Sequence, residues 1–182
     1  MKPRILLAID PGQMTGVCAW DLDGNIYDPI PELLMQMTKP VGLAQLDDNK
    51  LPKVIPDLFF HCHIDKMSDF MAWVVEEYTV EHLVVEHYIL YGRLAKQQSG
   101  SNMPASRIIG RAEMLAKLYN IKLDKPRADK LPSSLKHAGI TMPKSHKDSH
   151  RFSAYAHGYE YMITHKLAPS ALMIEKGYLT HG

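Results

Sequence analysis

A run of apolar residues that ends in a carboxylate constrains the fold of this chain more than any other feature. Residues 5–9 are apolar and lead directly into Asp10; a Pro-Gly pair follows, and a second apolar segment covers residues 17–20. Short apolar runs bounded by turn residues are typical of buried strands. We therefore predict two neighbouring strands joined by a turn, with an acid at the end of the first strand.

The same pattern occurs again in residues 82–86, where the segment HLVVE ends in Glu86. If these strands are neighbours, Asp10 and Glu86 lie at one edge of the sheet, and their like charges repel unless something neutralises them. A divalent cation is the usual partner of such a pair. The alternative is that each acid caps a helix or pairs with a lysine. Two strand-end acids, the first followed by a glycine turn, favour the metal site.

Helices and strands alternate along the rest of the chain. Apolar residues recur at helical spacing in several segments, which polar or proline-rich stretches separate. We expect helices at residues 66–78, 106–118 and 145–165, a brief strand at 121–123, a polar loop at 92–106 and an insertion at 28–57. This alternation indicates a single α/β domain over residues 1–182, with helices on both faces of a sheet.

The composition is that of an ordinary soluble domain. With 46% hydrophobic residues, 23% charged residues and a formal net charge of +1, the chain neither requires nor excludes a nucleic-acid partner. Cys18 and Cys62 lie far apart and form no metal-type pair, which favours a reducing compartment and hence the cytoplasm. We expect neither a membrane span nor a signal-type leader.

Positive charge is concentrated in one segment, residues 93–111, which contains no acid. A polar loop flanked by cations can follow a phosphate backbone without reading sequence, and aromatic residues in front of it can wedge against an opened base step. The alternative is a solvated surface loop. The residues expected to contact DNA are Tyr88, Tyr91, Arg93, Lys96, Arg107, Arg111, Lys147 and Arg151.

Four segments, in this order, resemble motifs of the RuvC-like Holliday junction resolvases, in particular the phage-type members. They are IDPGQMTG (9–16), VVEHYILYGR (84–93), SRIIGRAEMLA (106–116) and HRFSAYAHGYEYM (150–162). The resemblance implies a ribonuclease H-like fold with a mixed five-stranded sheet flanked by helices. It also implies a homodimer that nicks four-way DNA junctions symmetrically, in the host cytoplasm if the chain is phage-encoded.

The same resemblance implies two Mg²⁺ ions in each active site, with Mn²⁺ as a substitute. Two such ions activate a water and neutralise charge on the scissile phosphate. Asp10 would bridge the two ions and Glu86 would hold one of them. Gly12 and Gly16 would let the backbone approach the DNA phosphate closely.

The last motif departs from the family pattern because Ser153 occupies the position of the usual aspartate. His150 lies one helical turn earlier, and Asp148 is the only nearby acid. On a continuous helix Asp148 and His150 point to nearly opposite faces, so both can serve only if Asp148 lies at a non-helical cap. The predicted catalytic and metal-binding set is therefore Asp10, Glu86, His150 and Asp148.

Histidines and serine form a stripe on one face of the last helix, at positions 146, 150, 153 and 157, and we expect this face to look toward Asp10 and Glu86. We expect His150 to act as a base or metal partner, and His157 to be a buried, hydrogen-bonded core residue. Glu113 is a further acid, for which a surface or capping role is favoured. The apolar positions of residues 67–75 or 108–118 supply either core or a dimer interface.

Ser153 leaves three possibilities open: an active enzyme with a modified metal site, a weakened enzyme, or an inactive relative that still binds DNA. A ribonuclease H-like nuclease that acts on other branched DNA is a further alternative. An actin-like or sugar-kinase ATPase also opens with a strand, an Asp and a glycine turn. The second phosphate loop and the adenosine motif that such a fold needs are not found in the sequence.

Overall fold

One mixed sheet organises the chain. The computed structural model describes residues 1–23, 58–87, 103–142 and 146–167, apart from the side chains of residues 146–148. Within these ranges, five strands lie in the order β3-β2-β1-β4-β5. They are β1 (Arg4–Asp10), β2 (Met14–Asp21), β3 (Leu58–His63), β4 (Thr79–Val85) and β5 (Lys122–Asp124). β2 alone runs against the others, because it pairs antiparallel with both β1 and β3.

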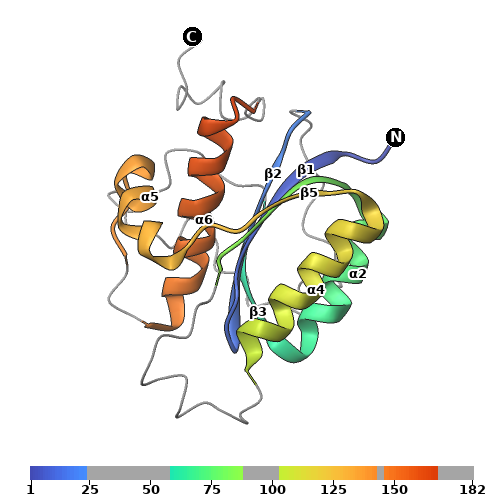
Figure 1. Cartoon of the computed structure of the whole chain (residues 1–182), viewed down its shortest axis with the longest axis horizontal. Coiled ribbons are helices and arrows are strands. Elements are labelled where there is room, and N and C mark those ends of the chain that lie inside the picture. The colour runs from blue at the N-terminus through green and yellow to red at the C-terminus, as the bar shows by residue number, and fades with distance from the viewer. Residues whose placement is uncertain (24–57, 88–102, 143–145, 168–182) are drawn as a thin grey trace.

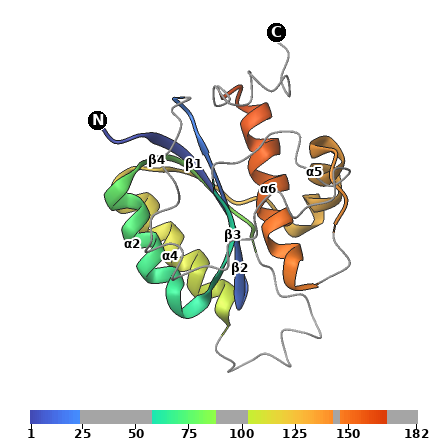
Figure 2. The same ribbon diagram turned by 180° about the vertical axis from the view of Figure 1, so that it is seen from behind.

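Helices cover both faces of this sheet (Figures 1 and 2). α2 (Ile64–Glu77) and α4 (Pro104–Tyr119) lie on one face. α5 (Leu131–Ala138), which follows the 3-10 turn η3 (Ala128–Lys130), and α6 (His146–Thr164) lie on the other. The expected α/β fold, a mixed five-stranded sheet flanked by helices, is confirmed.

β1 lies at the centre of the sheet and is buried on both faces. Ile5, Leu7 and Ile9 belong to the core under α2 and α4, whereas Leu6 and Ala8 belong to the core under α6. Successive side chains of a strand point to opposite faces, so this alternation carries the next even-numbered residue, Asp10, to the α6 face. The acid at the end of β1 is therefore placed by the strand period itself.

β4 runs parallel to β1 and places the second acid beside the first. Ile9 is opposite Val85, and the backbone N–H of Glu86 donates to the carbonyl of Ile9 at 3.0 Å. Val84 packs in the core under α6, so Glu86, two residues later, projects to that same face. This register places the two strand-end acids next to each other, as the sequence predicts.

α6 lies directly against the sheet because each side of the interface carries a glycine, Gly16 on β2 and Gly158 on α6. Gly16 is paired with Asp10, and a Cβ atom built there would lie 2.1 Å from the backbone carbonyl of His150. A Cβ atom on Gly158 would lie 2.4 Å from the ring of Trp20. The space expected to admit a DNA phosphate at Gly16 is therefore occupied by the backbone of α6.

Several expected boundaries differ from the structure. Residues 58–63 form β3, which the sequence analysis did not predict as a strand, and α4 begins at Pro104, inside the expected loop. Leu118, expected on an apolar helix face, is 69% exposed. The insertion at 28–57 lies outside the described residues. Among the helices that are described, none is both long and apolar enough to cross a membrane.

The two helical glycines Gly158 and Gly110 provide a matched test of this packing. Gly158→Ala should lower the free energy of unfolding by about 1–3 kcal/mol, because the added methyl meets Trp20 and Ala8. Gly110→Ala should raise it by about 0.5–1 kcal/mol, because nothing lies within 4 Å and alanine favours the helix. Urea unfolding of both variants measures the difference, and changes of the same sign would contradict the close approach of α6.

Candidate active site

Two acids and three side chains of α6 meet at the carboxyl ends of β1 and β4. Asp10 is buried, with 6% of its surface exposed, and Glu86 is largely buried. His150 Nδ1 lies 2.9 Å from Asp10 Oδ2. The first acid is thus paired with an imidazole from the helix that packs over it.

The second acid is held by two donors that reach the same oxygen. The hydroxyl of Ser153 donates to Glu86 Oε2 at 2.7 Å, and His157 Nε2 lies 3.0 Å from that atom. Positions 150, 153 and 157 are three and four residues apart, so they lie on one face of α6. Ser153, which stands where the resemblance implies an acid, therefore binds an acid.

Burial and hydrogen bonding act in opposite directions on the two carboxylates. Burial raises the pKa of Asp10, the charge of Glu86 adds to this, and the hydrogen bond with His150 opposes it, with a raised pKa as the result. Burial also raises the pKa of Glu86, but the hydrogen bonds from His157 and Ser153 outweigh it and the pKa is lowered. Glu86 is therefore the better-stabilised anion of the pair.

His150 is the basic partner of Asp10 in this site. Its hydrogen bond with Asp10 raises the pKa of the imidazole, against the effect of burial, and the charges of Asp10 and Glu86 act in the same direction as the hydrogen bond. Because the protonated ring is favoured, His150 offsets part of the charge of the two acids. The like-charge repulsion predicted from the sequence is met, in the protein alone, by side chains of α6.

The donor set suits a hard divalent cation. Two carboxylates share this edge, and among the described residues only the Oε2 atom of Glu86, not its Oε1 atom, receives hydrogen bonds. Mg²⁺ prefers oxygen ligands and keeps several waters, so few protein acids are needed. Within the described part of the chain, however, no group of three or more His, Cys, Asp or Glu side chains is arranged to hold a metal ion.

The other expected site residues do not all lie near the two acids. Arg107 is exposed in the first turn of α4, which Figure 1 shows at the end of the sheet where β1 terminates. Arg111 is partly buried between α2 and α4, on the face opposite α6. Glu113 pairs with Lys125 at the surface. The residues outside the described structure are Tyr88, Tyr91, Arg93 and Lys96, together with the side chains of Lys147 and Asp148.

Arg151 is not a surface cation, and the expectation that it contacts DNA is wrong for this structure. It is only 3% exposed, and its guanidinium lies 5.0 Å from the ring centre of Phe59 and 5.5 Å from that of Phe152. Such stacking on aromatic faces is a common way of burying an arginine. Its position on α6, next to His150, turns it toward β3 and away from solvent.

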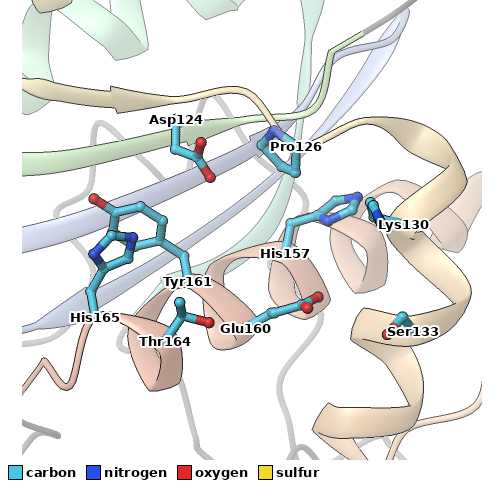
Figure 3. Close-up of a pocket in the computed structure, with 9 residues that line it drawn as sticks. All are labelled: Asp124, Pro126, Lys130, Ser133, His157, Glu160, Tyr161, Thr164 and His165. Atoms are coloured by element: carbon cyan, nitrogen blue, oxygen red, sulfur yellow. The ribbon is translucent and has the colours of Figure 1, made fainter.

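The individual roles of two site residues, Ser153 as a hydrogen-bond donor and His157 as a partner of Glu86, were not predicted from the sequence. His157 is buried and hydrogen-bonded, as expected, but its partner belongs to the site. The imidazole also borders a cavity of about 320 Å³ between β5, α5 and α6, shown in Figure 3. The spacing of the α6 stripe was the available signal, since it places His157 on the same face as His150.

No protein-family model matches the chain, and no curated protein matches it in sequence. Among solved structures, the chain is similar to RuvC from Thermus thermophilus in complex with a Holliday junction substrate, with a TM-score of 0.46, and to another T. thermophilus RuvC structure, with 0.47. In each case the two sequences are 12% identical, and the alignment covers 91% of this chain and 98% of the RuvC chain.

The His150–Asp10 pair predicts a pH-dependent contribution to stability. The pKa of His150 is raised in the folded state, so its stabilisation is present below the unfolded value of about 6.5 and is lost as pH rises through the folded pKa. The stability advantage of the wild type over His150→Gln should therefore be larger at pH 6 than at pH 9 in urea unfolding. In an Asp10→Asn background this pH dependence should disappear; its persistence there would assign it to another group.

Proposed function

We propose that this protein is a metal-dependent endonuclease of the RuvC-like type that nicks branched DNA, with four-way junctions as its preferred substrate. The observation that carries the proposal is the pair of carboxylates, Asp10 buried and Glu86 largely buried, at the ends of neighbouring parallel strands and beneath one face of α6. The resemblance of four segments to RuvC-like motifs supports the choice of branched DNA.

Asp10 and Glu86 would hold the divalent cations, Mg²⁺ or Mn²⁺, as the donor chemistry allows. When bound, such ions stabilise charge on a phosphate and lower the pKa of a water. His150 orients the carboxylate of Asp10 through Nδ1, and its raised pKa favours the protonated ring beside that acid. Ser153 and His157 fix Glu86 through a single oxygen.

DNA binding by this site requires positively charged side chains around the carboxyl ends of β1 and β4. Of the described candidates, Arg107 is exposed at the start of α4 and is well placed for a phosphate contact. We also propose a homodimer, since symmetric nicking needs two sites. The apolar positions of residues 67–75 are largely core, whereas Met114, Leu118 and Tyr119 of α4 are exposed.

A protein that binds junctions without cleaving them is the second candidate. Ser153 favours it, because a hydroxyl is a weaker ligand than a carboxylate for a hard cation. The pairing of each acid with a histidine favours it as well, because a cation must compete with these hydrogen bonds. Cleavage of a defined junction distinguishes the two candidates.

A labelled synthetic four-way junction tests the proposal directly. The wild type should make paired nicks with Mg²⁺ or Mn²⁺, and Asp10→Asn or Glu86→Gln should reduce the rate by about 100-fold or more, because each removes a carboxylate from the site. Asp69→Asn, an exposed acid paired with Lys66, is the matched control and should cleave normally. Tight binding with no nicking in either metal would establish the non-cleaving candidate instead.

Replacing Ser153 by aspartate tests whether this position limits metal binding. A third carboxylate beside Glu86 adds repulsion, so Ser153→Asp should melt at a lower temperature than the wild type in the presence of a chelator. Mg²⁺ should raise its melting temperature by more than it raises that of the wild type, because a ligand that binds only the folded state stabilises it. Thermal unfolding with and without Mg²⁺ gives both values, and equal metal responses would show that the position does not face the cation.

A further inference from the structure

A hydrogen-bonded link connects Glu86 to helix α5 through a buried imidazole. His157 Nε2 lies 3.0 Å from Glu86 Oε2, and its Nδ1 lies 3.4 Å from the hydroxyl of Ser134 on α5. The side chain of His157 is 2% exposed and Ser134 is fully buried. Both ring nitrogens therefore face a polar group of a different element.

We propose that His157 and Ser134 are positioning residues that hold the carboxylate of Glu86 in the orientation needed to bind a divalent cation. This inference rests on the proposed function, because it assigns Glu86 to the same metal site. It adds α5 and the second half of α6 to the parts of the chain on which that site depends.

The geometry at Glu86 supports a positioning role. Ser153 and His157 both reach Oε2, and no described residue donates a hydrogen bond to Oε1. A carboxylate anchored through one oxygen keeps the other for a ligand and loses its rotational freedom before the ligand arrives. Partners that orient a ligating group in this way contribute to metal affinity without touching the metal.

The orientation of the imidazole depends in turn on Ser134. Glu86 accepts a hydrogen bond from Nε2, so that nitrogen carries a hydrogen, and Nδ1 of the neutral ring accepts a hydrogen bond from the Ser134 hydroxyl. The hydroxyl of Ser134 has one hydrogen to donate, and the carbonyl of Lys130, at 3.2 Å, and the carboxylate of Glu160 compete with Nδ1 for it. The ring is thus contacted from two sides, by Glu86 at the end of β4 and by Ser134 on α5.

The cavity beside His157 shows why the ring needs this second contact. Figure 3 shows His157 at the wall of the space of about 320 Å³ that Glu160 and Ser133 also line. An imidazole held only by Glu86 has room on that side to turn away from the carboxylate. The Ser134 contact opposes this rotation, so its loss should weaken the hold on Glu86 while leaving both helices folded.

Three variants test the proposal by metal binding, measured as Mn²⁺ affinity by calorimetry without DNA, and by the Mn²⁺ concentration that gives half-maximal junction cleavage. His157→Leu should weaken Mn²⁺ binding by about 10–100-fold, the range known for residues that orient metal ligands. His157→Gln keeps an amide N–H near the position of Nε2 and should recover most of the affinity. Ser134→Ala should show a smaller loss in the same direction.

His82→Leu is the matched control. His82 is also a buried histidine of this core, hydrogen-bonded to the Tyr161 hydroxyl at 3.0 Å, but it makes no contact with either acid. Its replacement should affect stability and leave Mn²⁺ affinity within about twofold of the wild type. Junction affinity in the absence of metal should be unchanged in all four variants, because none of the three residues is placed on a DNA-contacting surface.

The outcomes separate this inference from the proposed function. Normal Mn²⁺ affinity in His157→Leu, with a wild type that cleaves, would overturn the positioning role and leave the nuclease intact. Loss of Mn²⁺ binding in His157→Leu and its recovery in His157→Gln would support the role even if the wild type binds junctions without nicking them. A wild type that binds no Mn²⁺ would overturn both. If His157→Leu does not fold, Ser134→Ala and His157→Gln decide the question.

Discussion

The burial of two adjacent carboxylates is the constraint on which the rest of this structure depends. The register of β1 against β4 fixes their separation, and strand alternation turns both toward α6. Burying like charges is unfavourable, and the raised pKa of Asp10 expresses that cost. The opposing contributions come from His150, Ser153 and His157, so α6 must lie close enough for short side chains to reach the acids.

That requirement explains the two glycines at the interface of α6 with the sheet. A side chain at Gly16 would overlap the backbone of His150, and one at Gly158 would overlap Trp20. The two contacts lie two helical turns apart and set both the height and the direction of the helix. The site is therefore a product of core packing, and substitutions well outside it act on the acids through the placement of α6.

Much of this arrangement follows from the sequence. The apolar runs before Asp10 and Glu86 determine strands, and parallel pairing brings their ends together, so the acidic pair was predictable. The roles of His157 and Arg151 were not. A histidine or arginine on a mostly apolar helix face gives the same pattern whether it meets solvent, an aromatic ring or an acid, and only the partners from β3 and β4 decide. β3 was missed because its sequence, LFFHCH, mixes polar and apolar residues without clear alternation.

Ser153 changes the electrostatic balance of the site in a definite direction. An acid at this position would add a third negative charge next to Glu86, which would attract a cation more strongly and repel its neighbours in the metal-free protein. A hydroxyl instead donates to Glu86 and lowers the pKa of that carboxyl. A serine at this position therefore lowers the repulsion between acids in the metal-free protein. It also lowers the attraction of the site for a divalent ion. In the proposed metal site, affinity for the ion would then come from how well Asp10 and Glu86 are oriented beforehand, so the residues that hold them would matter more than in a site with three acids.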